Sequence, residues 1–305
     1  MIKNCQEFVS SLEKEGLTFR HFSMVQQGEF HPDDADWNYK DVPHLHFIHH
    51  LVEAVPARID EDIIVSINLQ KIFGITMPLT VVNIESGPNS QMYFTTMGMF
   101  TLVIESTWTA VDEYNTKVTT TYNVGMKWYL LFMFPLIAWS LKRNYKDLMS
   151  GDIPMRLRRG QLRSWGYQFV KRGKRYGFAE TMAIGKQNVV NSNPNSALPA
   201  AVDIDIKSVF SKDGSEYFWG RSDHQGLRIR RHKDTLLFFP RMCPHEGAEL
   251  DKSQCFKEMI TCPWHGRPFK PLTVISLQHN QKVAIDNQLV IEVIDDKLRI
   301  GIDLK

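Results

Sequence analysis

The first 126 residues are built around segments in which polar and apolar positions alternate. The segment Leu17–Phe30 shows the pattern first, and five more follow it, at 63–73, 77–86, 91–96, 99–111 and 116–126. Alternation is typical of strands that bury one face, because successive side chains point to opposite sides of a sheet. Turn-forming runs such as "SGPNS" and "DEYN" separate the segments. We therefore expect consecutive antiparallel strands joined by short turns.

Helical patterns surround these strands. An amphipathic, charged segment opens the chain, and the polar stretch Pro32–His50 begins with proline and aspartate, as helices often do. A long helix is expected at about Trp128–Ser150, with a second helical run at Pro154–Gly166. The basic cluster Met155–Arg163 in that run predicts a solvated helix face. Together the order of elements predicts a sheet curled around the long helix, with an apolar cavity between them.

The expected lining of this cavity is rich in aromatic and sulfur-containing side chains. Alternation lets only every second residue of a strand face inward, so some of the candidates must belong to the core. The candidates are Phe73, Met77, Met92, Phe94, Met97, Met99, Phe100 and Trp108. Such a lining favours an apolar or aromatic small molecule.

The pattern changes after residue 185. Residues 186–202 are rich in Asn, Ser and Pro, have no hydrophobic period and predict a linker. Beyond them, short strand-like runs beginning with "SVFSKDG" alternate with turn signals such as "IDDK". The sequence thus predicts an α+β chain with a mixed domain at 1–185 and a compact all-β domain at 203–305.

Composition narrows the function classes. The chain has 305 residues, 23% of them charged, and a net charge of +2, which gives no reason to expect nucleic acid as a partner. Four cysteines are too few for a disulfide framework, so we expect a reducing, cytoplasmic compartment. The N-terminal segment lacks an apolar core and is not expected to be a signal peptide.

One apolar segment raises the question of a membrane. Trp128–Leu141 has no charged residue but is interrupted by Pro135 and falls short of a spanning helix. We expect a buried core helix here, with peripheral membrane contact as the alternative.

Two similar tips, "CPH" and "CPWHG", stand out in the C-terminal part. They supply Cys243 and His245, then Cys262 and His265. Structural zinc prefers paired cysteines on one side and histidines on the other. One thiolate and one imidazole from each tip suit instead a [2Fe–2S] centre in which two cysteines hold one iron and two histidines the other. Zinc is the less favoured alternative.

The spacing of the tips resembles the Rieske iron–sulfur signature, C-x-H-x₁₅₋₁₇-C-x-x-H, and the segment from about Lys207 onward resembles that domain throughout. The resemblance implies a [2Fe–2S] cluster on the four ligands. Rieske proteins of respiratory complexes carry two further cysteines that bridge the loops; Ala248 and Trp264 stand at those positions here. The chain is therefore closer to the oxygenase and ferredoxin branch, which implies a lower reduction potential.

The stretch "DVPHLHFIHH" is dense in histidine and predicts a second metal site. His44 and His49 are five residues apart, so they can converge only if the helix is loose or ends between them. His46 or His50 could replace one of them. Non-haem iron(II) sites use two histidines and one carboxylate and leave positions open for O₂.

Asp41-x-x-His44-x₄-His49 resembles the D-x₂-H-x₄-H motif of Rieske oxygenase catalytic domains. The resemblance implies that His44 and His49 bind a mononuclear Fe(II), and that Asp41 connects this site to a cluster histidine of a neighbouring subunit. It places the third ligand at Asp152, with Asp147 in reserve. The less favoured interpretation, which does not exclude the first, is that Asp152 caps the helix that follows it.

The family also has a START-like, helix-grip catalytic domain, although its members usually place the Rieske domain first. The resemblance implies an oxygenase that activates O₂ and oxidises a hydrophobic or aromatic small molecule. Because the chain has no G-x-G-x-x-G after a strand, its electrons would come from a separate NAD(P)H-dependent reductase, a ferredoxin, or both. The resemblance also implies a homo-oligomer, with a trimer as the expected form.

Two alternatives remain. In the first, the N-terminal domain binds a hydrophobic ligand without catalytic iron, and the Rieske domain transfers electrons. In the second, the N-terminal domain is only a docking platform.

Overall fold

The computed structural model describes residues 4–49, 52–59, 63–72, 75–169, 189–191, 199–223, 225–285 and 289–302. The chain divides into two compact units. Among the described residues, 4–165 belong to the first unit, and the rest, from Gly166 onward, belong to the second. The predicted linker at 186–202 lies largely outside the described residues, so the predicted domain boundaries stay a prediction.

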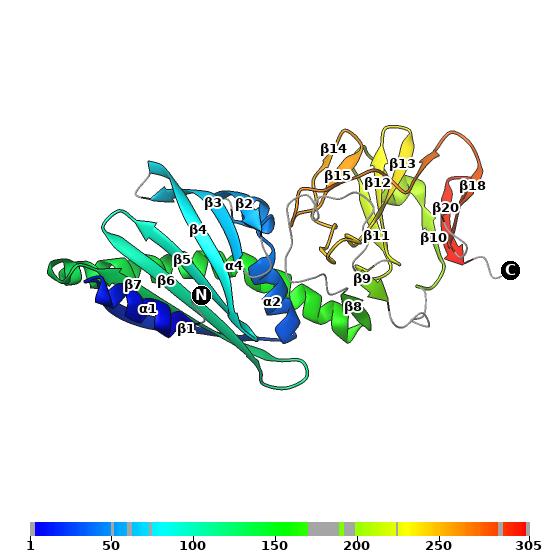
Figure 1. Ribbon diagram of the computed structural model, residues 1–305. Helices are drawn as coiled ribbons and strands as arrows, with labels where there is room; N and C mark the ends of the chain where they lie inside the picture. The colour runs from blue at the N-terminus through cyan, green and yellow to red at the C-terminus, as the bar shows by residue number, and fades with distance from the viewer. Residues whose placement is uncertain are drawn as a thin grey trace. The chain divides into compact units, whose positions relative to one another are not determined.

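A seven-stranded antiparallel sheet forms the first unit (Figure 1). Its order is β1-β7-β6-β5-β4-β3-β2, so the first strand pairs with the last. The strands are β1 (Thr18–Gly28), β2 (Val52–Ile59), β3 (Ile63–Ile72), β4 (Ile75–Gly87), β5 (Ser90–Met97), β6 (Phe100–Ala110) and β7 (Thr116–Met126). The six alternating segments of the sequence are confirmed as strands. β2 was not predicted, because Pro56 and a register shift between Pro56 and Arg58 interrupt its pattern.

Helices cover both faces of this sheet. They are α1 (Cys5–Lys14), α2 (Pro32–Lys40), α3 (His44–Ile48), the 3₁₀ helix η1 (Trp128–Met133) and α4 (Phe134–Ser164). Val103 of β6 packs with Met92 and α1, whereas its neighbour Leu102 packs with Tyr145 and Met149 of α4. Adjacent residues of a strand point to opposite faces, so α1 and α4 cover opposite sides. The predicted α+β arrangement, with a long helix against an antiparallel sheet, is confirmed.

The predicted cavity lining is partly wrong. Met92 and Phe94 pack under α1, on the face away from α4. Met77 and Met99 are exposed, and Phe73 lies outside the described residues. Alternation identifies which residues share a face, but the sequence does not tell which helix covers that face.

The two predicted helical runs near residue 150 form one continuous helix. α4 runs through Pro154, so Asp152 lies inside it and does not cap a second helix. The segment Trp128–Leu141 is not the buried core helix that was expected, because Trp128, Phe132 and Trp139 are largely exposed. No helix in the described part of the chain is long and apolar enough to cross a membrane.

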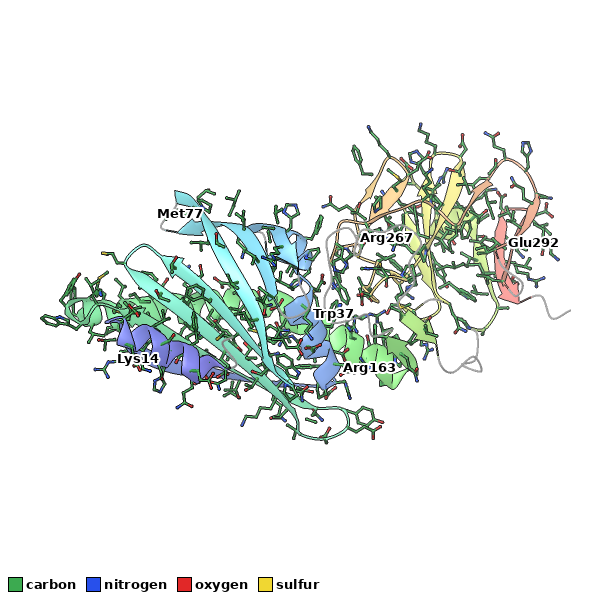
Figure 2. The ribbon with its side chains drawn as sticks, viewed as in Figure 1. Lys14, Trp37, Met77, Arg163, Arg267 and Glu292 are labelled. Atoms are coloured by element: carbon green, nitrogen blue, oxygen red, sulfur yellow. The ribbon has the colours of Figure 1, made fainter. Side chains whose placement is uncertain are left out.

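The basic cluster of α4 is also not the solvated face that was expected. Arg156 and Arg159 are buried. Arg159 and Arg163 both pair with the buried carboxylate of Asp34 on α2, with N···O distances of 2.9 Å. Arg159 also lies over the ring of Trp37, and Figure 2 shows Trp37 and Arg163 where α2 meets α4. The cluster therefore fixes α2 on α4.

Two glycines allow α4 to approach its neighbours closely. A Cβ atom on Gly151 would overlap Ile48 of α3 and lie 3.0 Å from His49 Cε1. A Cβ atom on Gly160 would overlap the carbonyl oxygen of Glu29, just before α2. The segment 29–49 is therefore held against the C-terminal half of α4.

The second unit consists of small antiparallel sheets. Their orders are β10-β20-β19-β18, β11-β12-β13-β17, β14-β15-β16 and β8-β9. The strand predicted at "SVFSKDG" is wrong: its first two residues end the helix α6 (Ile206–Val209), which Asp205 caps, and the rest form turns and bends. The strands are β8 (Tyr167–Phe169), β9 (Val189–Asn191), β10 (Val202–Asp205), β11 (Glu216–Trp219), β12 (Leu227–His232), β13 (Thr235–Pro240), β14 (Cys255–Phe256), β15 (Met259–Thr261), β16 (Pro268–Phe269), β17 (Thr273–Ser276), β18 (Gln281–Ala284), β19 (Leu289–Ile294) and β20 (Lys297–Ile302).

The packing under α1 predicts a stability difference between two methionines. Met92→Ala should lower the free energy of unfolding by about 2–5 kcal/mol, because the fully buried side chain leaves a cavity. Met99→Ala is the matched control and should change it by less than about 0.5 kcal/mol, because that side chain is exposed. Urea unfolding followed by circular dichroism measures both. Equal effects of the two substitutions would contradict the burial of Met92 under α1.

Candidate metal centres

The two tips of the second unit are built in the same way. In each, the amide of a glycine four residues after the cysteine donates to the cysteine carbonyl at 2.9 Å: Gly247 to Cys243 and Gly266 to Cys262. Both glycines have a positive φ, 86° and 64°, which residues with a Cβ rarely adopt. The amides of Cys243 and Cys262 in turn donate to Ala248 and Arg267. The similar sequences of the tips thus produce two similar tight loops.

The loops bring the four predicted ligands together in pairs. The side chains of Cys243 and Cys262 hydrogen-bond to each other, and the rings of His245 and His265 lie 5.1 Å apart, centroid to centroid. All four residues are buried. Burial raises the pKa of Cys262, and the adjacent Cys243 raises it further. Each pair, two thiols or two imidazoles, takes one member from each tip. This is the donor set of a centre with two unlike irons.

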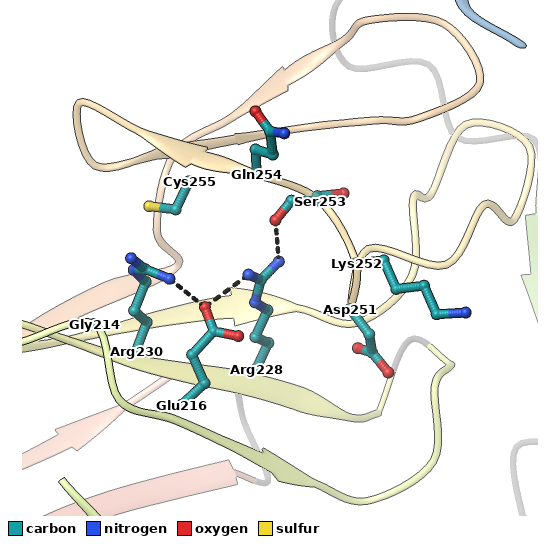
Figure 3. A pocket seen from close by; sticks show the side chains of 9 residues that line it. All are labelled: Gly214, Glu216, Arg228, Arg230, Asp251, Lys252, Ser253, Gln254 and Cys255. Atoms are coloured by element: carbon teal, nitrogen blue, oxygen red, sulfur yellow. Dashed lines mark hydrogen bonds and ion pairs between the residues drawn. The ribbon is translucent and has the colours of Figure 1, made fainter.

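The segment between the tips is fixed by a buried arginine. Arg228 of β12 donates to the carbonyl oxygens of Leu250 and Ser253 at 2.7 Å and pairs with Glu216 of β11 (Figure 3). Arg230 pairs with the same carboxylate. These residues line an open groove together with Cys255. Their charges are largely used in contacts within the domain, so the groove supports the loops and is not a candidate ligand site.

The first unit brings together His44, His49 and Asp152. The Nε2 atoms of His44 and His49 lie 3.1 and 2.9 Å from the same carboxylate oxygen, Asp152 Oδ1. One ligand atom from each residue lies within 4.8 Å of the others, and all three residues are buried. His44 begins α3, and the helix ends at Ile48, so His49 turns back towards its partner. The helix ends between the two histidines, which is one of the conditions that the sequence set for their convergence.

The donor set suits a cation. His44 Nδ1 donates to the carbonyl oxygen of Asp41. A neutral imidazole has only one N–H, so Nε2 of His44 then offers a lone pair. His44 Nε2 faces Asp152 Oδ1, and both atoms are then acceptors. Their contact is favourable only if the ring carries a second proton or a cation lies between Nε2 and Oδ1. Two imidazole nitrogens and one carboxylate oxygen are the ligands of non-haem iron(II) sites.

The other oxygen of Asp152 faces a buried guanidinium. Arg156 Nη2 lies 3.9 Å from Asp152 Oδ2 and also donates to Asn38 Oδ1 at 2.6 Å, while Asn38 Nδ2 lies 3.4 Å from Asp152 Oδ1. Burial alone would raise the pKa of Asp152, but its contacts with the rings of His44 and His49 and the charge of Arg156 lower it below its usual range. The carboxylate is therefore ionised.

The sequence did not predict Asn38 and Arg156 as part of this site. Arg156 follows Asp152 by four residues, which places both on one face of a helix, so the spacing could have indicated the pair. Asn38 has no comparable signal. It reaches the site because Asp34, four residues earlier on α2, is fixed to α4.

The remaining candidates lie elsewhere. Asp147 is exposed on α4. His46 is exposed, its ring in contact with Phe47, and it is not among the described residues grouped as metal ligands. His50 lies outside the described residues. Asp41 is buried, with a carboxylate oxygen 3.7 Å from His44 Nδ1.

Solved structures similar to this chain match about half of it. An aromatase/cyclase, Zhui from Streptomyces sp. R1128, is 13% identical, with 47% of this chain and 96% of that chain covered and a TM-score of 0.42. A START superfamily protein from Mycobacterium smegmatis is 9% identical (48% and 98% covered, TM-score 0.37). Norcoclaurine synthase from Thalictrum flavum is 8% identical (50% and 91% covered, TM-score 0.39). The expected START-like proteins are thus among the neighbours, but similarity at this level says nothing about activity.

No curated protein matches the sequence. The family model of the Rieske [2Fe-2S] domain matches residues 212–287, which contain both tips. The two loops, their paired cysteines and histidines and this match agree, and the C-terminal unit of the chain therefore contains a Rieske [2Fe–2S] domain.

Proposed function

We propose that this protein is a Rieske-type oxygenase that oxidises a small molecule at a mononuclear non-haem iron. One observation carries the proposal: two histidine nitrogens and a carboxylate oxygen converge within 4.8 Å in a buried position, in a chain that also has a Rieske domain. An electron carrier alone has no use for such a second donor set. Redox chemistry by an iron–sulfur domain needs a destination for its electrons, and this site offers one.

In this proposal the four residues of the tips hold the [2Fe–2S] cluster. Cys243 and Cys262 bind one iron, and His245 and His265 bind the other. Their pairing across the tips supports this division, because each iron then receives two like ligands. The backbone turns at Gly247 and Gly266 keep both loops tight.

The mononuclear site would be held by His44, His49 and Asp152. An Fe(II) ion bound there would supply O₂ activation, because two histidines and one carboxylate leave coordination positions open. The protein's part is to orient the ligands and to exclude water. The Asp41 carbonyl fixes the His44 ring, and Arg156 and Asn38 hold Asp152 as an ionised, oriented carboxylate.

Asp41 has a second proposed role. Its carboxylate lies beside His44 Nδ1, so it adjoins a ligand of the proposed iron. We propose that it connects this site to a cluster histidine of a neighbouring subunit in a homo-oligomer, a trimer by the family resemblance. Electrons would reach the cluster from a ferredoxin or an NAD(P)H-dependent reductase in the cytoplasm.

The proposed substrate is a hydrophobic or aromatic molecule that also carries a hydrogen-bonding group. Asn83 and Tyr93 donate to the carbonyl oxygen of Tyr39, so they face α2, and alternation places Gln91 and Thr95 on the same side as Tyr93. Asn83 Oδ1, Gln91 Oε1 and Thr95 Oγ1 are buried there without a hydrogen-bond partner among the described residues. Buried acceptors of this kind suit a substrate hydroxyl or amide, because leaving them unpaired is costly.

The cluster assignment predicts a contrast between two cysteines. Cys262→Ser should abolish the visible absorption of the cluster and remove its two irons, because serine does not replace a thiolate ligand of the cluster well. Cys255→Ser is the matched control: its thiol lies on β14 outside the two loops, and both iron content and spectrum should persist. Absorption spectra and iron analysis of anaerobically purified protein measure this. An intact spectrum in Cys262→Ser would contradict the assignment.

The mononuclear site predicts three irons per chain in the native protein. Asp152→Ala should keep the cluster spectrum, lose one iron and reduce turnover at least about 100-fold. A residue that only hydrogen-bonds to a metal ligand would have a smaller effect, because its loss typically costs about 10- to 100-fold. Asp147→Ala, five residues earlier on the same helix, should keep all three irons because its side chain is exposed. Substrate-dependent O₂ consumption, screened over hydroxylated hydrophobic compounds, gives the turnover.

The result that would reject the oxygenase is two irons per chain in the native protein, unchanged in His44→Ala, His49→Ala and Asp152→Ala. A Rieske electron-transfer protein with a ligand-binding N-terminal domain would then be the better account.

A further inference from the structure

The 3₁₀ helix η1 and the start of α4 carry an exposed stripe of large apolar side chains. Trp128, Tyr129, Phe132, Leu136 and Trp139 are between 57% and 78% exposed. An aromatic side chain presents roughly 150–250 Å², so these residues form about 500 Å² of apolar surface, as large as the largest patches of ordinary monomers. We name these five residues the aromatic stripe.

The stripe is a helix face that the fold leaves uncovered. Leu136 and Trp139 are three residues apart on α4, which places them on one side of that helix, and Phe132 lies near the end of η1 just before it. The opposite side, with Leu141 and Tyr145, packs on the sheet in the core. The helix already buries its other face in the core, so the exposed apolar residues are not needed for packing within this unit.

Basic residues continue the same face. Arg143 and Lys146 follow Leu136 and Trp139 by seven residues each, which keeps them on the same side of α4, and both are exposed. Lys127 precedes the stripe, and Lys142 lies with its amine over the ring of Phe22. The segment 127–146 thus holds four cations and no acidic residue, although the whole chain has a net charge of only +2.

A further apolar side chain lies at the same edge of the sheet. Phe100 pairs with Met126, the last residue of β7 before η1. The turn between β5 and β6 therefore ends beside the start of the stripe, and its Met99 is exposed.

We propose that the aromatic stripe and the basic residues behind it dock this protein on the surface of an anionic lipid bilayer. Trp and Tyr prefer the interface between water and acyl chains, and Lys or Arg beside an apolar face adds attraction to anionic headgroups. Arg143 and Lys146 lie about 6 and 10 Å along the helix from Trp139, at 1.5 Å per residue. The aromatic end enters the headgroup region while the cations remain at the level of the phosphates. The contact is peripheral and does not depend on the proposed iron site.

A lipid surface explains the combination better than a second copy of the chain does. Interfaces between protein subunits are depleted in lysine and in charge at their centre. In the described part of the first unit, the nearest acidic side chain along the same helix is Asp147, beyond the four cations. Among the described residues of η1 and α4, the exposed Asp147 is the one acidic group near this face, too few to match the four cations of a second copy.

Flotation of the full-length protein with vesicles tests this. The wild type should float with vesicles of phosphatidylcholine and phosphatidylserine at 7:3, and much less with phosphatidylcholine alone. Phe132→Ser with Trp139→Ser should weaken flotation at least tenfold. Arg143→Glu should weaken it about tenfold or more, because it reverses a charge near the headgroups. Raising the salt concentration should weaken the wild type in the same direction.

The controls use similar residues at the other end of the sheet. Val111 and Tyr114, in the turn between β6 and β7, are exposed to a comparable degree, and Lys117 is an exposed cation of β7. Val111→Ser with Tyr114→Ser, and Lys117→Glu, should float like the wild type. Circular dichroism establishes that every variant is folded.

Three results would overturn the proposal. The wild type could fail to float with the anionic vesicles at low salt. The stripe variants could float as well as the wild type. Sedimentation could instead show a concentration-dependent oligomer that the stripe variants convert to monomers without any flotation, in which case the face is an interface between copies.

Discussion

The first unit depends on the position of one buried carboxylate. Asp152 lies on α4, receives two imidazole nitrogens on one oxygen and faces a guanidinium with the other. A buried charge is tolerated only when it is paired and hydrogen-bonded. Helix α3, His49 directly after it and the side chain of Asn38 must therefore all lie against α4. The absence of a side chain at Gly151 makes that approach possible.

A second buried carboxylate holds this arrangement from the other end. Asp34 on α2 accepts hydrogen bonds from Arg159 and Arg163, which hold α2 against α4. Asn38 follows Asp34 by four residues on the same helix and therefore comes close to Asp152. Removing one partner of such a pair leaves an uncompensated buried charge, which costs about 3–5 kcal/mol. The cost explains why α4 carries so many arginines at positions that face inward. The same helix thus fixes the site with its C-terminal half and exposes an aromatic face with its beginning.

The sequence predicts the parts of this protein whose signals are local. Alternation located the strands of the first unit except β2, whose proline hides the pattern, and the spacing of the two tips led to the Rieske domain. The motif from Asp41 to His49 and the choice of Asp152 over Asp147 led to residues that the fold brings together. Their roles as ligands remain a proposal.

Most of the other failures depend on tertiary contacts. The sequence does not say that α1 covers Met92, that Arg156 and Arg159 are buried, or that Trp139 is exposed. Charge and hydrophobicity predict burial on average, but a buried acid such as Asp34 reverses the expectation for the arginines around it. Nor does a proline end a helix whose neighbours hold it on both sides, as α4 shows at Pro154.

Mössbauer spectroscopy of the protein enriched in ⁵⁷Fe and reduced under anaerobic conditions tests the central claim most directly. The account predicts a [2Fe–2S] cluster with two unlike irons, because histidines replace cysteines on one of them. It also predicts a third, equally intense signal of high-spin Fe(II) bound by nitrogen and oxygen ligands. A spectrum with the cluster alone, in protein purified with iron in excess, would contradict it.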